Sequence, residues 1–209
     1  MNNKQSITAT FDVDAQKGFS PVCPDELPVA GGDEIVGALN AMALLGSVRL
    51  GSKDAHAPNA PWVTADSAKI ATATGIKEAP LAWPAHCVVG TKGFELLDGL
   101  PAPEEYEFFV WKGIEGHLHP FGAVFHNVSE TRSTGVIEFL HSKGIARVVV
   151  GGLAYDYCVK STALQLAKAG FEVIIPLEAV RAISQETADQ ATQELKAAGV
   201  IIVNTVADI

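Results

Sequence analysis

The chain has 209 residues, of which 48% are hydrophobic and 19% are charged, a composition typical of one compact globular domain. The formal net charge is −9, and no stretch concentrates lysine or arginine. Binding to nucleic acid or to an anionic membrane surface is therefore not expected, because both depend on basic patches. We expect a single domain over residues 1–209.

The sequence also bears on cellular location. Its first residues lack the apolar stretch and cleavage site of a signal peptide, and no apolar run approaches the roughly 18 residues needed to span a bilayer. The three cysteines, Cys23, Cys87 and Cys158, are an odd number, which argues against a disulfide framework. We therefore expect a cytoplasmic protein with free thiols.

Apolar, β-branched runs alternate with helical patterns along the chain. The expected strands cover residues 6–13, 48–53, 107–112, 146–151, 172–176 and 200–204, and the expected helices cover 33–45, 129–142, 157–169 and 185–198. Ser129 is the expected N-cap of the second helix. This alternation predicts an α/β fold, a three-layer α/β/α sandwich with a mostly parallel central sheet. The long irregular segment 55–103 interrupts it, and such segments are usually functional.

Chemically useful side chains follow four of the expected strands. Asp14 follows the first strand, Asp54 and His56 follow the second, Lys112 ends the third and Cys158 comes shortly after the fourth. Ligands bind beyond the carboxyl ends of the strands in open parallel sheets. One crevice is therefore expected to collect a carboxylate, an Asp/His pair, an amine and a thiol.

Cys158 is the candidate nucleophile. Gly151 and Gly152 lead from a strand into a helix, and Cys158 is expected in the first turn of that helix. The partial positive charge of a helix N-terminus lowers a thiol pKa, and its unpaired N–H groups can form an oxyanion hole. A buried structural cysteine is the alternative.

A nucleophilic thiol needs a proton acceptor, and no histidine follows Cys158. Asp14 is the candidate base, since a carboxylate partly removed from water has a raised pKa and can take and return a proton. Lys112 could hold the thiolate by its charge. A capping role for Asp14 and a solvated strand end for Lys112 are the alternatives.

Three residues could hold a divalent metal ion. Asp54 and His56 flank one residue, so their side chains point to the same side of an extended segment. His86 could be a third ligand, and two imidazoles with one carboxylate suit Zn²⁺, Mn²⁺ or Fe²⁺; solvated polar side chains are the alternative. His117 and His119 form a further H-x-H pair, for which a polar loop is the favoured interpretation.

Five motifs together resemble the nicotinamidase/pyrazinamidase family of the isochorismatase-like cysteine hydrolases, over nearly the whole chain. The family patterns D-x-Q-x-x-F, D-x-H, W-P-x-H-C-V, K-G and G-x-A-x-D-x-C-V match Asp14-Ala15-Gln16-Lys17-Gly18-Phe19, Asp54-Ala55-His56, Trp83-Pro84-Ala85-His86-Cys87-Val88, Lys112-Gly113 and Gly152-Leu153-Ala154-Tyr155-Asp156-Tyr157-Cys158-Val159.

The resemblance implies hydrolysis of nicotinamide, and of pyrazinamide, to the acid and ammonia through a thioester on Cys158, as a step of NAD salvage. It makes Asp14 and Lys112 catalytic, and gives the metal the task of orienting the pyridine nitrogen. It also implies a cis peptide bond between Leu153 and Ala154, which would place the N–H groups of Ala154 and Cys158 in an oxyanion hole. The alternative is a related cysteine amidase acting on N-carbamoyl or ureidoacrylate-type substrates.

The resemblance also yields a substrate pocket and shows two departures. Phe19 and Trp62 are expected to sandwich the aromatic ring, with Tyr155, or alternatively Tyr157, lining the pocket; core packing is the other interpretation. The N-H-x-S-F stretch that often follows D-x-H is here N-A-P-W-V, so a fourth metal contact is left open, with Asp66 as a candidate. The stretch after Lys112 also differs. A small aromatic carboxamide and a second copy of the chain are the expected partners.

Overall fold

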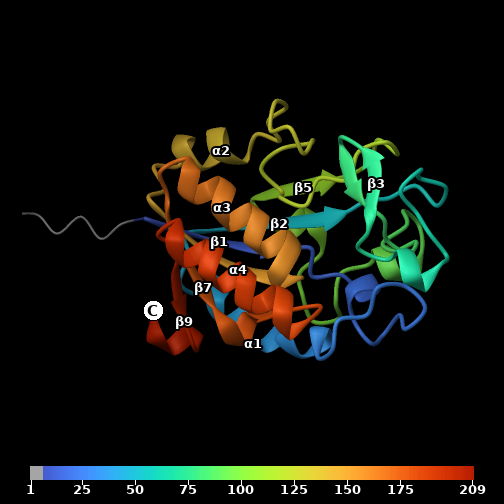
Figure 1. Ribbon diagram of the computed structural model, residues 1–209. Helices are drawn as coiled ribbons and strands as arrows, with labels where there is room; N and C mark the ends of the chain where they lie inside the picture. The colour runs from blue at the N-terminus through green and yellow to red at the C-terminus, as the bar shows by residue number, and fades with distance from the viewer. Residues whose placement is uncertain (1–6) are drawn as a thin grey trace, which may run out of the picture.

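The computed structural model describes residues 7–209 and is built on one parallel sheet (Figure 1). The strands run in the order β5-β2-β1-β6-β7-β9, with β8 beside β6, and every pair among them is parallel. They are β1 (Thr8–Val13), β2 (Val48–Asp54), β5 (Phe108–Lys112), β6 (Arg147–Leu153), β7 (Glu172–Pro176), β8 (Val180–Arg181) and β9 (Ile201–Val203). All six predicted strands are present, although the predicted start at Ser6 lies outside the described residues. The short β8 was not predicted.

Helices cover both faces of this sheet, which confirms the predicted α/β architecture. They are α1 (Val36–Ala43), α2 (Val136–Ser142), α3 (Lys160–Lys168) and α4 (Gln185–Ala197). Successive residues of a strand point to opposite faces: Val149 of β6 packs in a cluster with Leu39 of α1, whereas Val148 packs in a second cluster with Leu166 and Leu195 of α3 and α4. None of the helices in residues 7–209 is long and apolar enough to cross a membrane.

Three of the predicted helices begin later as α-helix, and the one predicted from Asp33 becomes α1 at Val36, directly after the 3-10 turn Gly32–Ile35. The helix predicted from Ser129 begins at Val136, since Gly135 has a left-handed φ of 91° that a continuous helix does not allow. Ser129 caps no helix; its N–H and hydroxyl both donate to the carboxylate of Glu78. The residues from Tyr157 are helical as predicted, but the π-type turn Tyr155–Val159 comes first and continues directly into α3 at Lys160.

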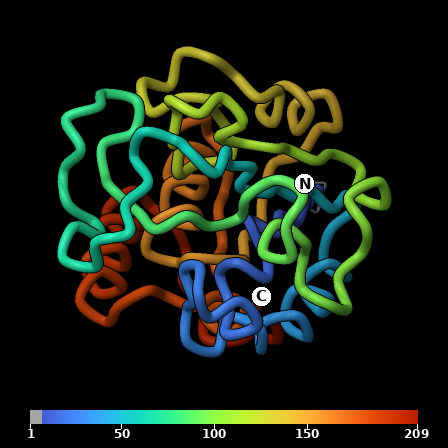
Figure 2. Tube along the Cα trace, turned by 90° about the vertical axis from the view of Figure 1, so that its right-hand side faces the viewer, coloured from blue at the N-terminus to red at the C-terminus, as the bar shows by residue number. Residues whose placement is uncertain are grey.

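The irregular segment predicted over 55–103 contains a small hairpin that the sequence analysis missed. Its strands are β3 (Ala73–Ile76) and β4 (Ala79–Leu81), which pair antiparallel. In Figure 1 this segment lies at the right, where the arrows of β2 and β5 point, and Figure 2 views the molecule from that side. The segment therefore lies over the carboxyl ends of the strands, where a ligand site is expected.

Strand register brings the candidate residues to this end. Asp54 and Lys112 are Cα partners across β2 and β5, and Val13 is the partner of Gly152 across β1 and β6. A Cβ on Gly152 would lie 1.9 Å from the carbonyl oxygen of Val13, and its φ is +123°. Only glycine therefore lets β6 approach the carbonyl of Val13 this closely.

Candidate active site

The site is organised around the wholly buried side chain of Lys112. Its Nζ lies 2.9 Å from Oδ2 of Asp14, donates to Oδ1 of Asp54, and lies 3.5 Å from Sγ of Cys158. It also donates to the carbonyl oxygen of Pro120 at 3.2 Å. The structure thus brings the three predicted catalytic residues together and links them to Asp54 of the predicted metal set.

Asp14 is fixed at the end of β1 by Ser52 on the neighbouring strand. Ser52 Oγ donates to Asp14 Oδ1 at 2.7 Å and accepts from the Asp14 N–H at 3.2 Å. Burial raises the pKa of the Asp14 carboxyl above its ordinary value, although the charge of Lys112 opposes this shift. A carboxyl poised in this way suits proton transfer.

Cys158 lies in a five-residue π-type turn, Tyr155–Val159, that precedes α3. Burial raises the pKa of its thiol well above the ordinary value, and the charge of Lys112 only partly offsets the effect. The net shift is upward, because loss of water around a side chain that is 5% exposed outweighs the influences that lower this pKa. The raised pKa favours the thiol form, so nucleophilic attack by Cys158 needs a base that removes its proton.

A cis peptide bond joins Leu153 and Ala154, as the resemblance implied. The carbonyl oxygen of Ala154 accepts hydrogen bonds of 3.1 Å from the N–H groups of both Tyr157 and Val159. Ala154 thus begins the turn that carries Cys158.

A cluster of potential metal ligands lies beside Lys112. Asp54, His56, His86 and His119 each offer one ligand atom, and these atoms all lie within 4.8 Å of one another. All four side chains are at most 3% exposed. Three of them form the predicted set. The fourth, His119, was assigned to a polar loop, and that interpretation is wrong because the side chain is buried in the cluster.

The predicted ligands are held by contacts that aim them at each other. The backbone of Asp54 is clamped by the Gln16 side chain, which accepts from its N–H at 2.7 Å and donates to its carbonyl at 2.9 Å. Nδ1 of His86 donates to the Pro84 carbonyl at 2.7 Å, while Nε2 of His86 and Nε2 of His56 lie 3.9 and 3.4 Å from Asp54 Oδ2. Such outer contacts set the tautomer and orientation of metal ligands.

The protonation states of this cluster fit a divalent cation. Burial, helped by His56, lowers the pKa of His86 to about 3, so its imidazole is neutral near pH 7. Burial raises the pKa of Asp54, but the charge of Lys112 together with the adjacent His56 outweighs it and holds that pKa well below the ordinary value. Both ring nitrogens of His56 are buried without a hydrogen-bond partner within residues 7–209. Neutral imidazoles and a carboxylate are the forms that bind metal.

The side chain of Cys158 lines a small, mostly apolar cavity that the histidine cluster also lines. Its volume is about 20 Å³, and its lining comprises Phe19, Leu27, Asp54, Trp83, His86, His119, Phe121, Ala154, Tyr157, Cys158 and Ile183. The cavity therefore joins the sulfur of Cys158 to two members of the histidine cluster, His86 and His119.

Of the aromatic residues predicted to bind substrate, only Phe19 lines this cavity. Trp62 lies behind it, with its ring centroid 4.6 Å from that of His56. Tyr155 points away into the core, where its hydroxyl lies 2.8 Å from Thr192 Oγ1 on α4. The alternative, Tyr157, is the tyrosine in the cavity. Trp83 and Phe121 complete the aromatic lining and were not predicted for this role.

Comparison with known proteins identifies the family of this chain. The isochorismatase domain model matches residues 62–207. A nicotinamidase of Acinetobacter baylyi is 31% identical over 92% of this chain and 90% of its own length. The chain belongs to the nicotinamidase family of isochorismatase-domain proteins.

Solved structures of family members have the same fold. The nicotinamidase/pyrazinamidase of Acinetobacter baumanii has a TM-score of 0.86 at 27% identity, over 98% of this chain and 99% of that chain. A pyrazinamidase of Pyrococcus horikoshii in complex with zinc has a TM-score of 0.73 at 28% identity, over 94% of this chain and 98% of that chain.

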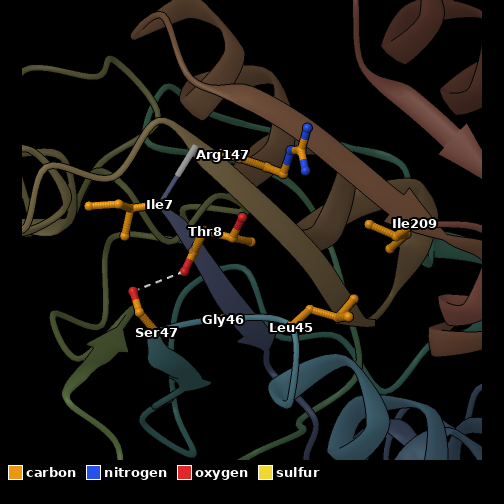
Figure 3. Close-up of a pocket in the computed structure, with 7 residues that line it drawn as sticks. All are labelled: Ile7, Thr8, Leu45, Gly46, Ser47, Arg147 and Ile209. Carbon is orange, nitrogen blue, oxygen red and sulfur yellow. Dashed lines mark hydrogen bonds between the residues drawn. The ribbon is translucent and has the colours of Figure 1, made fainter. Parts of the chain in front are cut away.

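A wider groove of about 500 Å³ lies elsewhere on the protein itself (Figure 3). Its lining residues are Ile7, Thr8, Leu45, Gly46, Ser47, Arg147 and Ile209. They belong to the amino ends of β1, β2 and β6 and to the end of the chain, opposite to the end that carries Lys112. The groove holds no cluster of buried ionisable groups, so the smaller cavity at Cys158 is the candidate active site.

Proposed function

We propose that the protein hydrolyses nicotinamide to nicotinate and ammonia, and also accepts pyrazinamide. The observation that carries this proposal is the contact of one buried ammonium, on Lys112, with the Asp14 carboxylate and the Cys158 thiol at the wall of an aromatic cavity. A nicotinamidase covers 92% of the chain at 31% identity, which supports the choice of substrate.

In the proposed mechanism, Asp14 takes the proton from the Cys158 thiol, and Lys112 stabilises the thiolate. The sulfur attacks the carboxamide carbon, and the N–H groups of Ala154 and Cys158 face the developing oxyanion. Asp14 then gives the proton to the departing nitrogen, the C–N bond breaks and ammonia leaves. A water molecule deprotonated by Asp14 attacks the thioester, the C–S bond breaks, and the acid and the thiol are released.

We propose that Asp54, His56 and His86 hold one divalent ion, either zinc, manganese or iron. The unpartnered nitrogens of His56 and the lowered pKa of His86 support this role. Such an ion would supply a Lewis acid for the ring nitrogen of the substrate, and Asp54, His56 and His86 would hold it beside the cavity that Cys158 lines. Phe19 and Tyr157 then contact the ring from the cavity wall.

The proposal predicts that purified protein releases ammonia from nicotinamide and that Cys158→Ala lowers kcat/KM by at least about 10³-fold. Cys23→Ala is the matched control, because Cys23 is also buried and lines no part of the cavity; it should keep activity. Ureidoacrylate and N-carbamoyl substrates are assayed in parallel. The proposal fails if these react faster than nicotinamide, or if Cys158→Ala stays active.

We further propose that residues 1–209 act as one domain, in the cytoplasm and as a homo-oligomer within NAD salvage. The two large buried apolar clusters that share the central sheet support a single domain. Light scattering on the purified protein measures the oligomeric state, and a monomer would contradict that part.

A further inference from the structure

His119 has surroundings that ordinary core packing does not explain. The ring is 3% exposed, and neither ring nitrogen has a hydrogen-bond partner among the described residues. A buried polar group of this kind is normally paired, because burying it unpaired opposes folding. Its ligand atom lies within 4.8 Å of those of Asp54, His56 and His86.

The backbone around His119 holds the ring at this place. The His119 N–H donates to the carbonyl oxygen of Glu78 at 2.8 Å, and the next carbonyl, of Pro120, accepts from Lys112 Nζ at 3.2 Å. The ring packs against Trp62, with centroids 4.2 Å apart, and against Phe121 at 5.2 Å. One ring nitrogen therefore lies beside the cluster, while the loop backbone and the two aromatic rings hold the side chain in place.

We infer that His119 is a fourth protein ligand of the metal ion, supplied by the loop that follows β5. This inference rests on the proposed metal site and extends it to a set of one carboxylate and three imidazoles, a set that favours zinc and its transition-metal neighbours over magnesium or calcium. Asp66, the candidate for a fourth contact, is exposed and accepts from the N–H of Ala68 instead.

A ligand from this loop has a structural consequence. The segment from Lys112 to Pro120 is fixed at both of its ends by contacts in the active site. At its start, Lys112 contacts Asp14 and Cys158, and near its end His119 lies in the metal cluster. Gly113 lies against His56, where a Cβ would come within 2.7 Å of its ring. Binding of the ion therefore fixes the loop whose Pro120 carbonyl accepts from the catalytic lysine.

The test measures metal binding rather than turnover. Zinc affinity is measured by competition with a chromophoric chelator for the wild type, His119→Phe and His119→Ala. His119→Phe keeps a buried ring but offers no nitrogen. Its dissociation constant for zinc should rise by about 10–100-fold or more, and the visible spectrum of the cobalt-loaded form should change. His117→Ala is the matched control, since His117 is an exposed histidine of the same loop; its affinity should not change.

A second measurement needs no variant. X-ray absorption at the zinc edge of the wild-type protein should show three imidazole ligands. A spectrum that fits only two imidazoles would overturn the inference. An unchanged zinc affinity and an unchanged cobalt spectrum in His119→Phe would also overturn it. These outcomes are separate from failure of the proposed function. Protein that binds zinc through three imidazoles but releases no ammonia from any amide keeps the inference and refutes the activity.

Discussion

Lys112 carries one positive charge between two buried carboxylates, and this imbalance sets the proton affinities of the site. The Asp14 and Asp54 carboxylates and the Cys158 sulfur lie within 4.8 Å of one another. Burial lowers the pKa of Lys112, but the two carboxylates outweigh it and raise that pKa well above the ordinary value, so the amine stays charged. The remaining negative charge adds to the burial that raises the pKa of Asp14.

The pH dependence of activity follows from Asp14. Only its unprotonated form accepts the thiol proton, so kcat/KM should fall as the pH falls through the pKa of Asp14, above the ordinary value of about 4. Lys112→Gln removes the charge that lowers this pKa, so the acid limb should move to higher pH and kcat/KM should drop by about 10²–10⁴-fold.

The measurement is a pH profile of kcat/KM for the wild type, Lys112→Gln and Lys53→Gln. Lys53 is also a nearly buried lysine, but its ammonium lies over the ring of Phe94 rather than beside Asp14. The control should keep the acid limb in place. An acid limb that does not move in Lys112→Gln would refute the assignment of Asp14 as the base.

At the scale of elements, the turn after β6 depends on the absence of a side chain at Gly152. Gly152→Ala combines a φ of +123° with a Cβ 1.9 Å from the Val13 carbonyl oxygen, and should lower the free energy of unfolding by about 3 kcal/mol or more. Gly170→Ala is the matched control, because Gly170 has a φ of +93° but open space around it. It should cost only about 1–2 kcal/mol.

Urea denaturation of both variants measures the difference. Equal losses of stability would mean that the close approach of β6 to β1 contributes nothing beyond backbone conformation. Activity of any Gly152→Ala protein that still folds should also fall, because the same turn positions Cys158.

The boundaries of helices and strands were predictable where the hydrophobic periodicity is strong. They were not predictable where a glycine conformation or a polar contact with a distant residue sets the boundary. The buried strands β1 and β6 read as apolar runs, and both are present within about two residues. The helix expected from Ser129 begins seven residues later, because Gly135 has a left-handed φ and Ser129 pairs with Glu78 instead of capping a helix. The β3–β4 hairpin was missed, since alanine, glycine and proline give little strand signal.

At the scale of the whole molecule, the metal cluster joins segments far apart in the chain. Asp54 and His56 come from the end of β2, His86 from the segment after β4, and His119 from the loop after β5. An ion that binds only the folded state stabilises it by about 2.7 kcal/mol at a concentration of 100 Kd. For a chain of this size, that corresponds to about 5–10 °C in Tm.

Removal of the ion with a chelator should therefore lower Tm by this amount, and addition of zinc should restore it. Calorimetry with and without chelator makes the measurement, with magnesium as the control ion that should not substitute. If Tm is the same without chelator, with chelator and after zinc is added back, no ion links these segments.

The candidate site was partly predictable for a topological reason. Asp14, Asp54 and Lys112 were found because each ends or follows a strand, and parallel strands deliver their carboxyl ends to one edge. His119 was missed because its position depends on a loop that folds back over that edge. Such a loop shows neither the helical nor the strand period of hydrophobic residues, about 3.6 and 2 residues. The H-x-H spacing and the unusual stretch after Lys112 were the available signals.

Because Asp54 pairs with Lys112 across β2 and β5, enzyme activity depends on the correct alignment of these two strands. A slip of β5 by one residue would move Trp111 into the place of Lys112 and turn the amine to the opposite face of the sheet. A chain misaligned in this way would be compact but inert. Specific activity after refolding therefore counts the molecules in which these two strands have found the correct alignment, a quantity that helix content alone does not measure.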